Sequence, residues 1–320
     1  MGMGMAGHLG LARESAWGTP VAVTSGGYVE LLSESMVLTI DRFDIKNIAA
    51  MYAEADDMAG INKVAGDVEF PCFPEVLGRF LRGVFGAPST VTSLAATLNK
   101  NIFKTPTADF ASGQPTPPYT FEVYRDVTSA QQISGVVMTS LELSMKPNQE
   151  LRGKVGIIGK NMLNIAKTTP TYISSPSFPF SFDTCSLALG SSATALIEAL
   201  TISIDNQLEG ISALNASTAI AKVRRSGPQT VNISGTLDFS DITEFNNFLN
   251  QTEQSLQATF TKANSFMVAV IVPRMVYTAF PVSVGDKGRT TVGFSGKGRY
   301  HTGSATAIAI ELTTTSSGGN

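Results

Sequence analysis

The chain has 320 residues, of which 43% are hydrophobic and 15% are charged, and its formal net charge is −3 at pH 7. The length allows two domains, and the mildly acidic balance argues against a polyanion-binding protein, because strong nucleic-acid binders concentrate basic residues. The charged fraction lies well below the usual value of about a quarter in soluble domains. We therefore expect partners to cover much of the surface.

The N-terminal segment has no continuous apolar run, so we expect no secretory signal there. The most apolar stretch, residues 265–280, is interrupted by Pro273 and Arg274 and is too short to span a bilayer as a helix. Cys72 and Cys185 are the only cysteines. Their number and spacing fit neither a disulfide framework nor a metal site, and we expect both thiols to be reduced.

Alternation of apolar and polar residues dominates the chain and predicts half-buried strands in antiparallel sheets. In residues 33–41, the side chains of Met36, Leu38 and Ile40 fall on one face of the predicted strand. Val37, Thr39 and Asp41 fall on the other face. Further strands are predicted at 119–126, 138–146, 153–160, 196–206, 230–239, 256–262, 267–272, 274–280, 289–298 and 305–312.

Two segments predict helices. Residues 74–86 begin with Pro74, which suits the first helical position, and they carry one apolar face. In residues 240–250, Asp241 and Glu244 have the spacing of a capping box, with Asp241 as the cap. The predicted apolar face of this second helix consists of Phe245, Phe248 and Leu249.

The second half of the chain repeats the order of the first half. Adding 169 to residue numbers aligns a strand and the helix that follows it without a gap, for example Gly66 with Gly235. An offset of 164 aligns the strand 34–41 with 198–205. An offset of 137 aligns 155–160 with the later strand. We infer a tandem duplication of one β-rich unit.

This repeat predicts the domain organisation. We expect an N-terminal arm (1–27), a first β domain (28–167), a Pro/Ser/Thr-rich linker (168–180) and a second β domain (181–320). The first domain carries an insertion at about 87–118, rich in Ser, Thr, Ala and Pro, which we expect to be a functional, interacting or disordered loop.

Two long loops and one tryptophan are candidate contact sites. The loop at 42–63 is acidic, with Glu54, Asp56 and Asp57, whereas its counterpart at 206–230 is basic. The basic residues are Lys222, Arg224 and Arg225. Trp17 is the only tryptophan, and we expect it to anchor the arm, because an exposed lone tryptophan is unusual.

Residues 153–161, GKVGIIGKN, look at first like a phosphate loop, but the register excludes the motif. A Walker A loop requires a glycine where this chain has Lys154, and Ser or Thr where it has Asn161. The pattern also returns at 290–299. His8 and His301 stand in no catalytic motif, and the acidic loop does not match a calcium loop. We therefore expect no enzyme, no cofactor and no metal site.

The N-terminal residues LGLARESAWGTPVAV (9–23) and YVELLSESM (28–36) resemble those of tail tube proteins from long-tailed, non-contractile, siphovirus-like bacteriophages. Residues 65–86, 118–126 and 134–160 are similar to later strands and the helix of that family, and 197–209 and 225–241 resemble the second half of its duplicated members. The resemblance covers nearly the whole chain in order, except for the insertion at 87–118.

This resemblance implies a mainly β fold of two tandem antiparallel β-sandwiches, each with one short flanking α-helix, whose inner strands join an inter-subunit β-barrel. It implies a structural virion protein that forms rings, trimeric with pseudo-six-fold symmetry, stacked into a hollow tube that conducts DNA during ejection. The implied partners are further copies, a tape-measure protein, and terminator and baseplate proteins, with no membrane and no sequence-specific DNA binding. The tail would be assembled in the host cytoplasm.

An alternative hypothesis for the function is a tail-completion, terminator or baseplate component, which forms a single ring that does not stack. A secreted β-adhesin or outer-membrane barrel is disfavoured by the missing signal. We expect the acidic loop (Glu54, Asp56, Asp57) and the basic loop (Lys222, Arg224, Arg225) to bridge stacked rings or neighbouring subunits.

Overall fold

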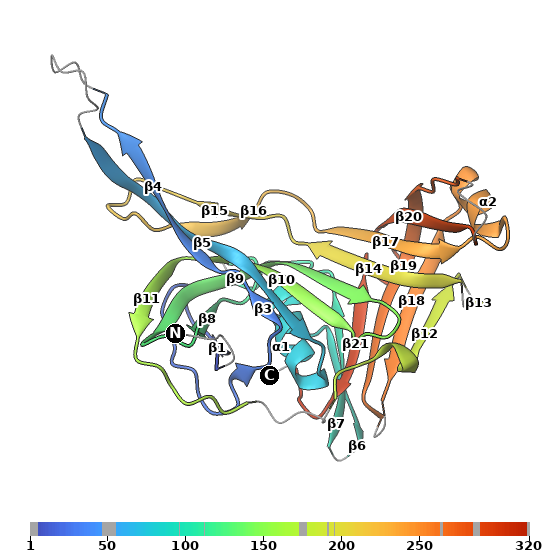
Figure 1. Ribbon diagram of the computed structural model, residues 1–320, viewed down its shortest axis with the longest axis horizontal. Helices are drawn as coiled ribbons and strands as arrows, with labels where there is room; N and C mark the ends of the chain where they lie inside the picture. Colours follow the sequence, from blue (N-terminus) through green and yellow to red (C-terminus); the bar gives the residue numbers. More distant parts are fainter. Residues whose placement is uncertain are drawn as a thin grey trace.

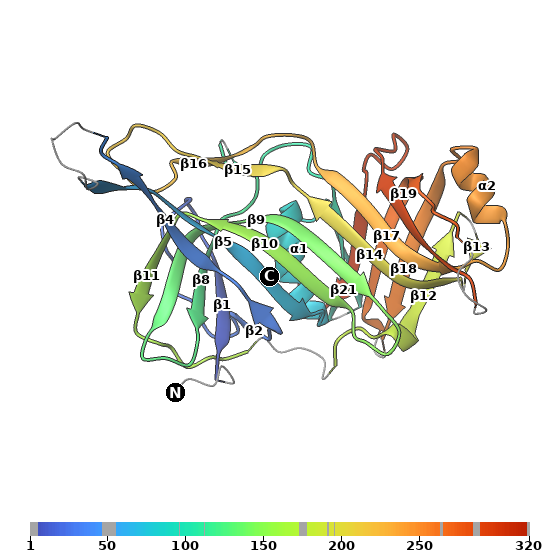
Figure 2. The ribbon, with the colours of Figure 1, turned by 45° about the horizontal axis from the view of Figure 1, so that its top comes forward.

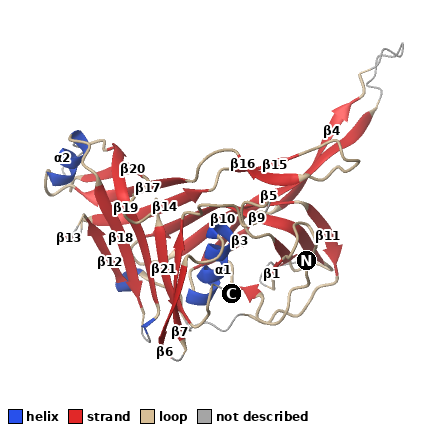
Figure 3. Ribbon diagram, turned by 180° about the vertical axis from the view of Figure 1, so that it is seen from behind, coloured by secondary structure: helices blue, strands red, loops and turns tan. Residues whose placement is uncertain are grey.

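A computed structural model of the chain describes residues 6–46, 56–95, 97–111, 113–172, 178–190, 192–194, 196–262, 265–283 and 289–318. These residues form a mainly β protein with antiparallel strands and two short α-helices, α1 (Pro74–Phe85) and α2 (Thr243–Leu249), as the sequence predicts. Figure 1 shows an elongated molecule in which α1 lies near the centre and α2 lies at one end. The view from behind shows the same separation of the two helices (Figure 3).

Most described strands belong to one hydrogen-bonded sheet system. In the part of the chain N-terminal to the predicted linker they are β1 (His8–Arg13), β2 (Tyr28–Val29), β3 (Ser33–Glu34), β4 (Val37–Asp44), β5 (Asp57–Pro71), β6 (Thr90–Ala95), β7 (Leu98–Lys104), β8 (Tyr119–Tyr124), β9 (Ala130–Met145), β10 (Arg152–Gly159) and β11 (Asn161–Ile165). After it come the 3₁₀ turn Phe182–Thr184 and β12 (Cys185–Leu189), β13 (Ser192–Ala193), β14 (Ile197–Asp205), β15 (Leu208–Ile211), β16 (Lys222–Arg225), β17 (Thr230–Asp238), β18 (Gln254–Thr261), β19 (Met267–Ala279), β20 (Thr291–Gly298) and β21 (Ala309–Thr314).

Eight of these strands form a continuous antiparallel sheet that crosses both halves of the chain. Its order is β4, β5, β10, β9, β14, β17, β20 and β19. Figure 2 shows β9, β10, β14 and β17 side by side in this sheet. The two halves are therefore joined through the pairing of β9 with β14, and a second junction is the pairing of β7 with β21.

This sheet has one apolar face and one polar face, because side chains alternate along each strand. Val68, Val155 and Leu141 lie opposite one another on adjacent strands and are buried in the core. The polar face carries a row of directly opposed side chains across six strands: Glu69, Lys154, Glu142, Ser203, Asn232 and Lys297.

The strand registers follow the same numerical offsets as the sequence. The β5–β10 pairing sets Val64 opposite Gly159, and the β17–β20 pairing sets Ile233 opposite Gly296. These pairs differ by 169 and 137. The β4–β5 pairing sets Leu38 opposite Val64, and the β14–β17 pairing sets Ile202 opposite Ile233. Here Leu38 and Ile202 differ by 164, and Val64 and Ile233 differ by 169. The two helices also begin 169 residues apart, at Pro74 and Thr243.

The two helices differ in their surroundings. Ten of the residues of α1 are buried, and the helix packs against β9, β7 and β21. Phe80 stacks on Phe70 with ring centroids 3.9 Å apart. The buried carboxylate of Glu75 accepts hydrogen bonds from the backbone N–H of Thr315 at 2.8 Å and from its hydroxyl at 2.6 Å. The C-terminal strand and the residues after it are thus fixed to the first helix.

Helix α2 packs mainly against β19, and none of its residues is fully buried. Its Phe245 and Phe248 contact Phe280, but Leu249, expected on the apolar face, is 59% exposed. The predicted capping box is wrong: Ile242 is the residue before the helix, and Asp241 instead accepts a hydrogen bond from the N–H of Thr243.

Three predicted loops contain strands. The insertion at 87–118 includes the hairpin β6–β7, in which β7 also pairs with β21, about 200 residues later in the chain. Within 42–63, residues 42–44 and 57–63 belong to the paired strands β4 and β5, which project from the body as a hairpin (Figure 1). The basic residues of 206–230 lie on β16, which pairs with β15.

The predicted strands at 267–272 and 274–280 are one strand, β19, which contains Pro273.

Candidate functional site

An open groove lies between the start of β4 and the strand β11. It measures about 720 Å³ and is lined by residues 34–38, Arg125, Gln131 and residues 162–164. Val37 and Leu163 are 60% and 56% exposed, so its rim is apolar. The exposed edge of β4 forms one wall, because β4 pairs with β5 alone within the described chain. An open apolar groove beside a free strand edge is a typical protein-binding surface.

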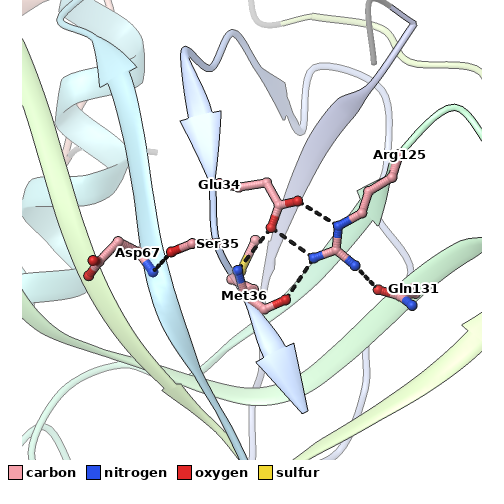
Figure 4. A network of polar contacts seen from close by, with 6 residues as sticks. All are labelled: Glu34, Ser35, Met36, Asp67, Arg125 and Gln131. Carbon is pink, nitrogen blue, oxygen red and sulfur yellow. Dashed lines mark hydrogen bonds and ion pairs between the residues drawn. The ribbon is translucent and has the colours of Figure 1, made fainter. Parts of the chain in front are cut away.

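A network of polar contacts fixes the floor of this groove (Figure 4). Arg125 is the residue after β8. Its guanidinium donates to both carboxylate oxygens of Glu34, at 2.5 and 2.8 Å, and to the carbonyl of Met36 at 2.8 Å. It also donates to the side chain of Gln131 on β9. On the other side, the Ser35 hydroxyl accepts a hydrogen bond from the N–H of Asp67 on β5 at 3.0 Å.

This network holds Glu34 in its charged form. Burial raises the pKa of the Glu34 carboxyl, but the hydrogen bonds from Arg125 and from the N–H of Met36 outweigh burial and hold the pKa below its usual range. The pKa of Arg125 is raised by its hydrogen bond to Glu34. The ion pair therefore fixes the break between β3 and β4, from which the projecting hairpin starts.

None of these groove residues was predicted to belong to a site. The signal that was available is Val37, an apolar residue on the predicted polar face of its strand. Ile40 was expected on the buried face but is 49% exposed, because β4 leaves the body of the protein at this point.

The expected acidic and basic contact residues lie on adjacent ribbons of the same chain. The hairpin strand β5 contacts the segment before β16, where the Asn62 N–H donates to the carbonyl of Thr218 at 2.7 Å. Asp56 is exposed, and Asp57 pairs with Arg42 on the opposite strand of its own hairpin. Glu54 lies outside the described residues.

On β16, Lys222 and Arg224 are exposed. Arg225 is half-buried, forms an ion pair with Asp109 at 3.3 Å and donates to the carbonyl of Pro115 at 3.2 Å. Asp57 and Arg225 are thus paired with other residues of the same chain, Arg42 and Asp109, and not with each other. The assembly role of these residues stays a prediction.

Trp17 lies half-buried against its own chain. Its indole N–H donates to the carbonyl of Gly135 at 2.9 Å, and the Lys160 ammonium lies 4.7 Å from its ring centroid. A side chain at Gly135, where φ is +65°, would collide with the indole nitrogen and with Lys160. The lysine of the apparent phosphate loop is therefore a contact of Trp17, and β10 leads into β11, not into a helix.

The two thiols are free, and burial raises the pKa of both, to about 11 for Cys185. Neither has the depressed pKa of a nucleophilic cysteine. Among the described residues, His, Cys, Asp and Glu side chains form no group of three or more that could hold a metal ion. No helix in the described part of the chain is long and apolar enough to cross a membrane.

An antiparallel β protein that exposes strand edges and apolar surface has the features of a subunit that assembles. The chain belongs to the phage tail tube protein family, whose model matches residues 4–297. No curated protein is significantly similar to it. The chain is therefore a structural component of a phage tail and not an enzyme, and family membership implies self-assembly into a tube in the virion tail.

Proposed function

We propose that this chain is a tandem-duplicated tail tube subunit of a long-tailed, non-contractile phage. Three copies form a ring with pseudo-six-fold symmetry, and the rings stack into the hollow tube that conducts DNA during ejection. In this proposal residues 28–167 and 181–320 are the two tail-tube-like domains, 1–27 is the arm and 168–180 is the linker. The tape-measure, terminator and baseplate proteins are the other partners, and assembly takes place in the host cytoplasm.

The observation that carries the proposal is the agreement between the sequence offsets and the strand registers. Three offsets, 164, 169 and 137, relate residues of the two halves, and the same three numbers relate the β4–β5–β10 registers to the β14–β17–β20 registers. Two unrelated domains have no reason to share both a strand order and its registers. A duplicated unit supports a ring of three chains, because three chains supply six units.

Two glycines at equivalent positions give further support. A Cβ atom on Gly66 would lie 2.4 Å from the carbonyl oxygen of Ser35, and one on Gly235 would lie 2.5 Å from that of Ala199. Ser35 and Ala199 are related by 164, and the glycines by 169. Each half thus has the same close approach between neighbouring strands, and only glycine fits there.

The polar face of the eight-stranded sheet is the proposed wall of the lumen. Its central row contains two carboxylates, two ammonium groups and two uncharged polar side chains, with Lys154 opposite both Glu69 and Glu142. A surface without a basic excess does not retain phosphates, because strong DNA binding depends on neutralising them with Lys and Arg. This composition suits a conduit through which DNA must move.

We predict that the basic residues of β16 contribute to polymerisation. The triple variant Lys222→Glu/Arg224→Glu/Arg225→Glu is expected to block tube formation or to make it strongly salt-sensitive, although one exposed ion pair is worth only about 0–1 kcal/mol. A tube repeats each contact many times. Light scattering and negative-stain microscopy at low and high salt measure the effect.

Two variants serve as controls for this prediction. Lys222→Glu/Arg224→Glu leaves the Arg225–Asp109 pair intact, so it separates assembly from local stability. Lys146→Glu reverses an exposed charge in the turn between β9 and β10. Unchanged polymerisation of the triple variant would rule out a role for these residues.

Electron microscopy of the purified protein, alone and with a tape-measure protein, tests the proposal as a whole. Rings and tubes are expected. The alternative function, a terminator or baseplate ring, predicts single rings that do not stack and few copies in each particle. A chain that stays monomeric under all assembly conditions contradicts both.

A further inference from the structure

The unequal burial of the two equivalent helices points to a missing contact. Helix α1 is buried because β21 and β7 cover it in addition to β9 of its own half. Helix α2 packs mainly on β19, the counterpart of β9. Ile242 and Leu249, at either end of α2, are 60% and 59% exposed. The surface that would complete the surroundings of α2 is the counterpart of β21.

That counterpart is β11. The pairing of β9 with β11 sets Ala130 opposite Ile165, and the pairing of β19 with β21 sets Met267 opposite Thr313. The residue numbers of β9 and β19 differ by 137 at these positions, and those of β11 and β21 differ by 148. Five successive pairs obey the same relation. Strand β11 carries the exposed Leu163 and lines the groove beside β4. Because β21 covers α1, we expect its counterpart β11, and with it the groove, to be the surface that covers α2.

The strand edges show the same imbalance. Strand β14 pairs with β17 on one side and with β9 of the other half on the other side. Its counterpart β4 has only β5 as a partner among the described strands. At the opposite end of the eight-stranded sheet, residues 278 and 279 of β19 and residues 281–283 that follow the strand are exposed. The sheet thus has one free edge at each end.

We infer that the contact between the two halves of one chain recurs between chains, so that the α2 end of one copy docks into the groove between β4 and β11 of a second copy. In this contact α2 covers Val37 and Leu163, and the segment after β19 pairs with β4. The inference rests on the proposed function, and it names the two surfaces that close the ring.

The projecting hairpin has a role in the same contact. Its counterpart, the segment from β15 to β16, reaches back over the first half, where Ile220 and Val223 pack on Val137 and Ile158. The β4–β5 hairpin would reach in the same way over the second half of the neighbouring copy. This explains why Phe43 and Met58 of the hairpin are more than half exposed in a single chain.

The positions of the surfaces fit a head-to-tail contact. In Figure 1, β11 and the projecting hairpin lie at one end of the longest axis, and α2 lies at the other end. Two different surfaces at opposite ends make a heterologous contact, which forms a closed ring when the rotation between copies closes.

Complementation between two variants tests this inference. Variant A, Ile242→Asp/Leu249→Asp, alters the α2 end, and variant B, Val37→Asp/Leu163→Asp, alters the groove. Each pair of substitutions is expected to weaken the contact about 100-fold, so A and B alone stay monomeric where the wild type forms rings. Mixed in equal amounts, they should form a heterodimer and nothing larger, because A keeps an intact groove and B an intact α2. Mass photometry measures the sizes.

The heterodimer itself shows that both variants are folded, and circular dichroism checks each one alone. Val91→Asp on β6, an exposed apolar residue of the insertion without a counterpart in the second half, is the control and should assemble like the wild type. Rings formed by A or B alone overturn the inference while the proposed function stands. A mixture of folded variants that stays monomeric also overturns it. A wild type that forms no rings contradicts the proposed function and this inference together.

Discussion

Replacing Gly66 or Gly235 by alanine is expected to lower the free energy of unfolding by about 2–3 kcal/mol in either half of the protein. The added Cβ would lie 2.4 Å from the carbonyl oxygen of Ser35 in the first case and 2.5 Å from that of Ala199 in the second. Neither carbonyl can move away freely. Ala199 lies on β14, which is also paired with β9, and Ser35 is next to Met36, which is buried in the core. Thermal unfolding followed by circular dichroism should show a melting temperature lower by about 5 °C.

Gly293→Ala on β20 is the matched control, because it lies in the same sheet and its nearest neighbour is the carbonyl oxygen of Gly235, 4.0 Å from the added Cβ. We expect this variant to be close to the wild type in stability. If Gly66→Ala is destabilised and Gly235→Ala is not, the two positions do not share the same structural constraint, and the proposed duplication loses one of its supports.

Replacing Arg125 by alanine is expected to cost about 2–3 kcal/mol and to loosen the groove. The substitution removes both hydrogen bonds from the guanidinium to the Glu34 carboxylate and leaves the Met36 carbonyl without that donor. Breaking a fully buried ion pair costs about 3–5 kcal/mol. The lower value is appropriate here because the Arg125 side chain is 34% exposed and solvent screens the charge.

The same ion pair predicts a pH dependence. The pKa of Glu34 is lower in the folded protein than in the unfolded chain, so the folded state binds fewer protons at intermediate pH. Its contribution to stability is complete above the unfolded pKa and is lost as the pH falls through the folded pKa. The difference in stability between wild type and Arg125→Ala, measured by urea unfolding, should therefore be largest at neutral pH. It should shrink as the pH falls through the folded pKa, to the part that comes from the lost hydrogen bond to the Met36 carbonyl.

Arg125→Lys is the control for geometry. Lysine keeps the charge but cannot donate to both carboxylate oxygens and to a carbonyl through one planar group. We expect a loss intermediate between the wild type and Arg125→Ala. Equal stability of all three proteins at neutral pH would show that the network does not hold the base of the hairpin.

Period-two alternation and one strong apolar helix face were sufficient to predict most strands of the eight-stranded sheet and the helix α1. These signals are local, and they reflect burial against a single core. The hairpin β6–β7 could not be predicted in this way. Its residues are rich in Ser and Thr, and β7 is held by β21, far along the chain.

The groove could not be predicted from local sequence patterns either. Glu34 and Arg125 are 91 residues apart, and nothing in the residues around either one indicates the other. Lys222, Arg224 and Arg225 were recognised as a basic cluster, but the pairing of Arg225 with Asp109 of the insertion depends on the fold. What the sequence did contain was the mismatch of Val37, an apolar residue on the predicted polar face of its strand, whereas Leu249 was expected on an apolar helix face. In the structure both are exposed apolar residues, Val37 at the start of β4 and Leu249 at the end of α2.

The number of chains in one ring is the most direct test of a duplicated tube subunit. Cryo-electron microscopy of the assembled tube should show three chains in each ring and six similar units around the lumen, with β4, β5, β10, β9, β14, β17, β20 and β19 of each chain in the inner wall. Six chains in each ring, or an inner wall built from other strands, would contradict the proposal.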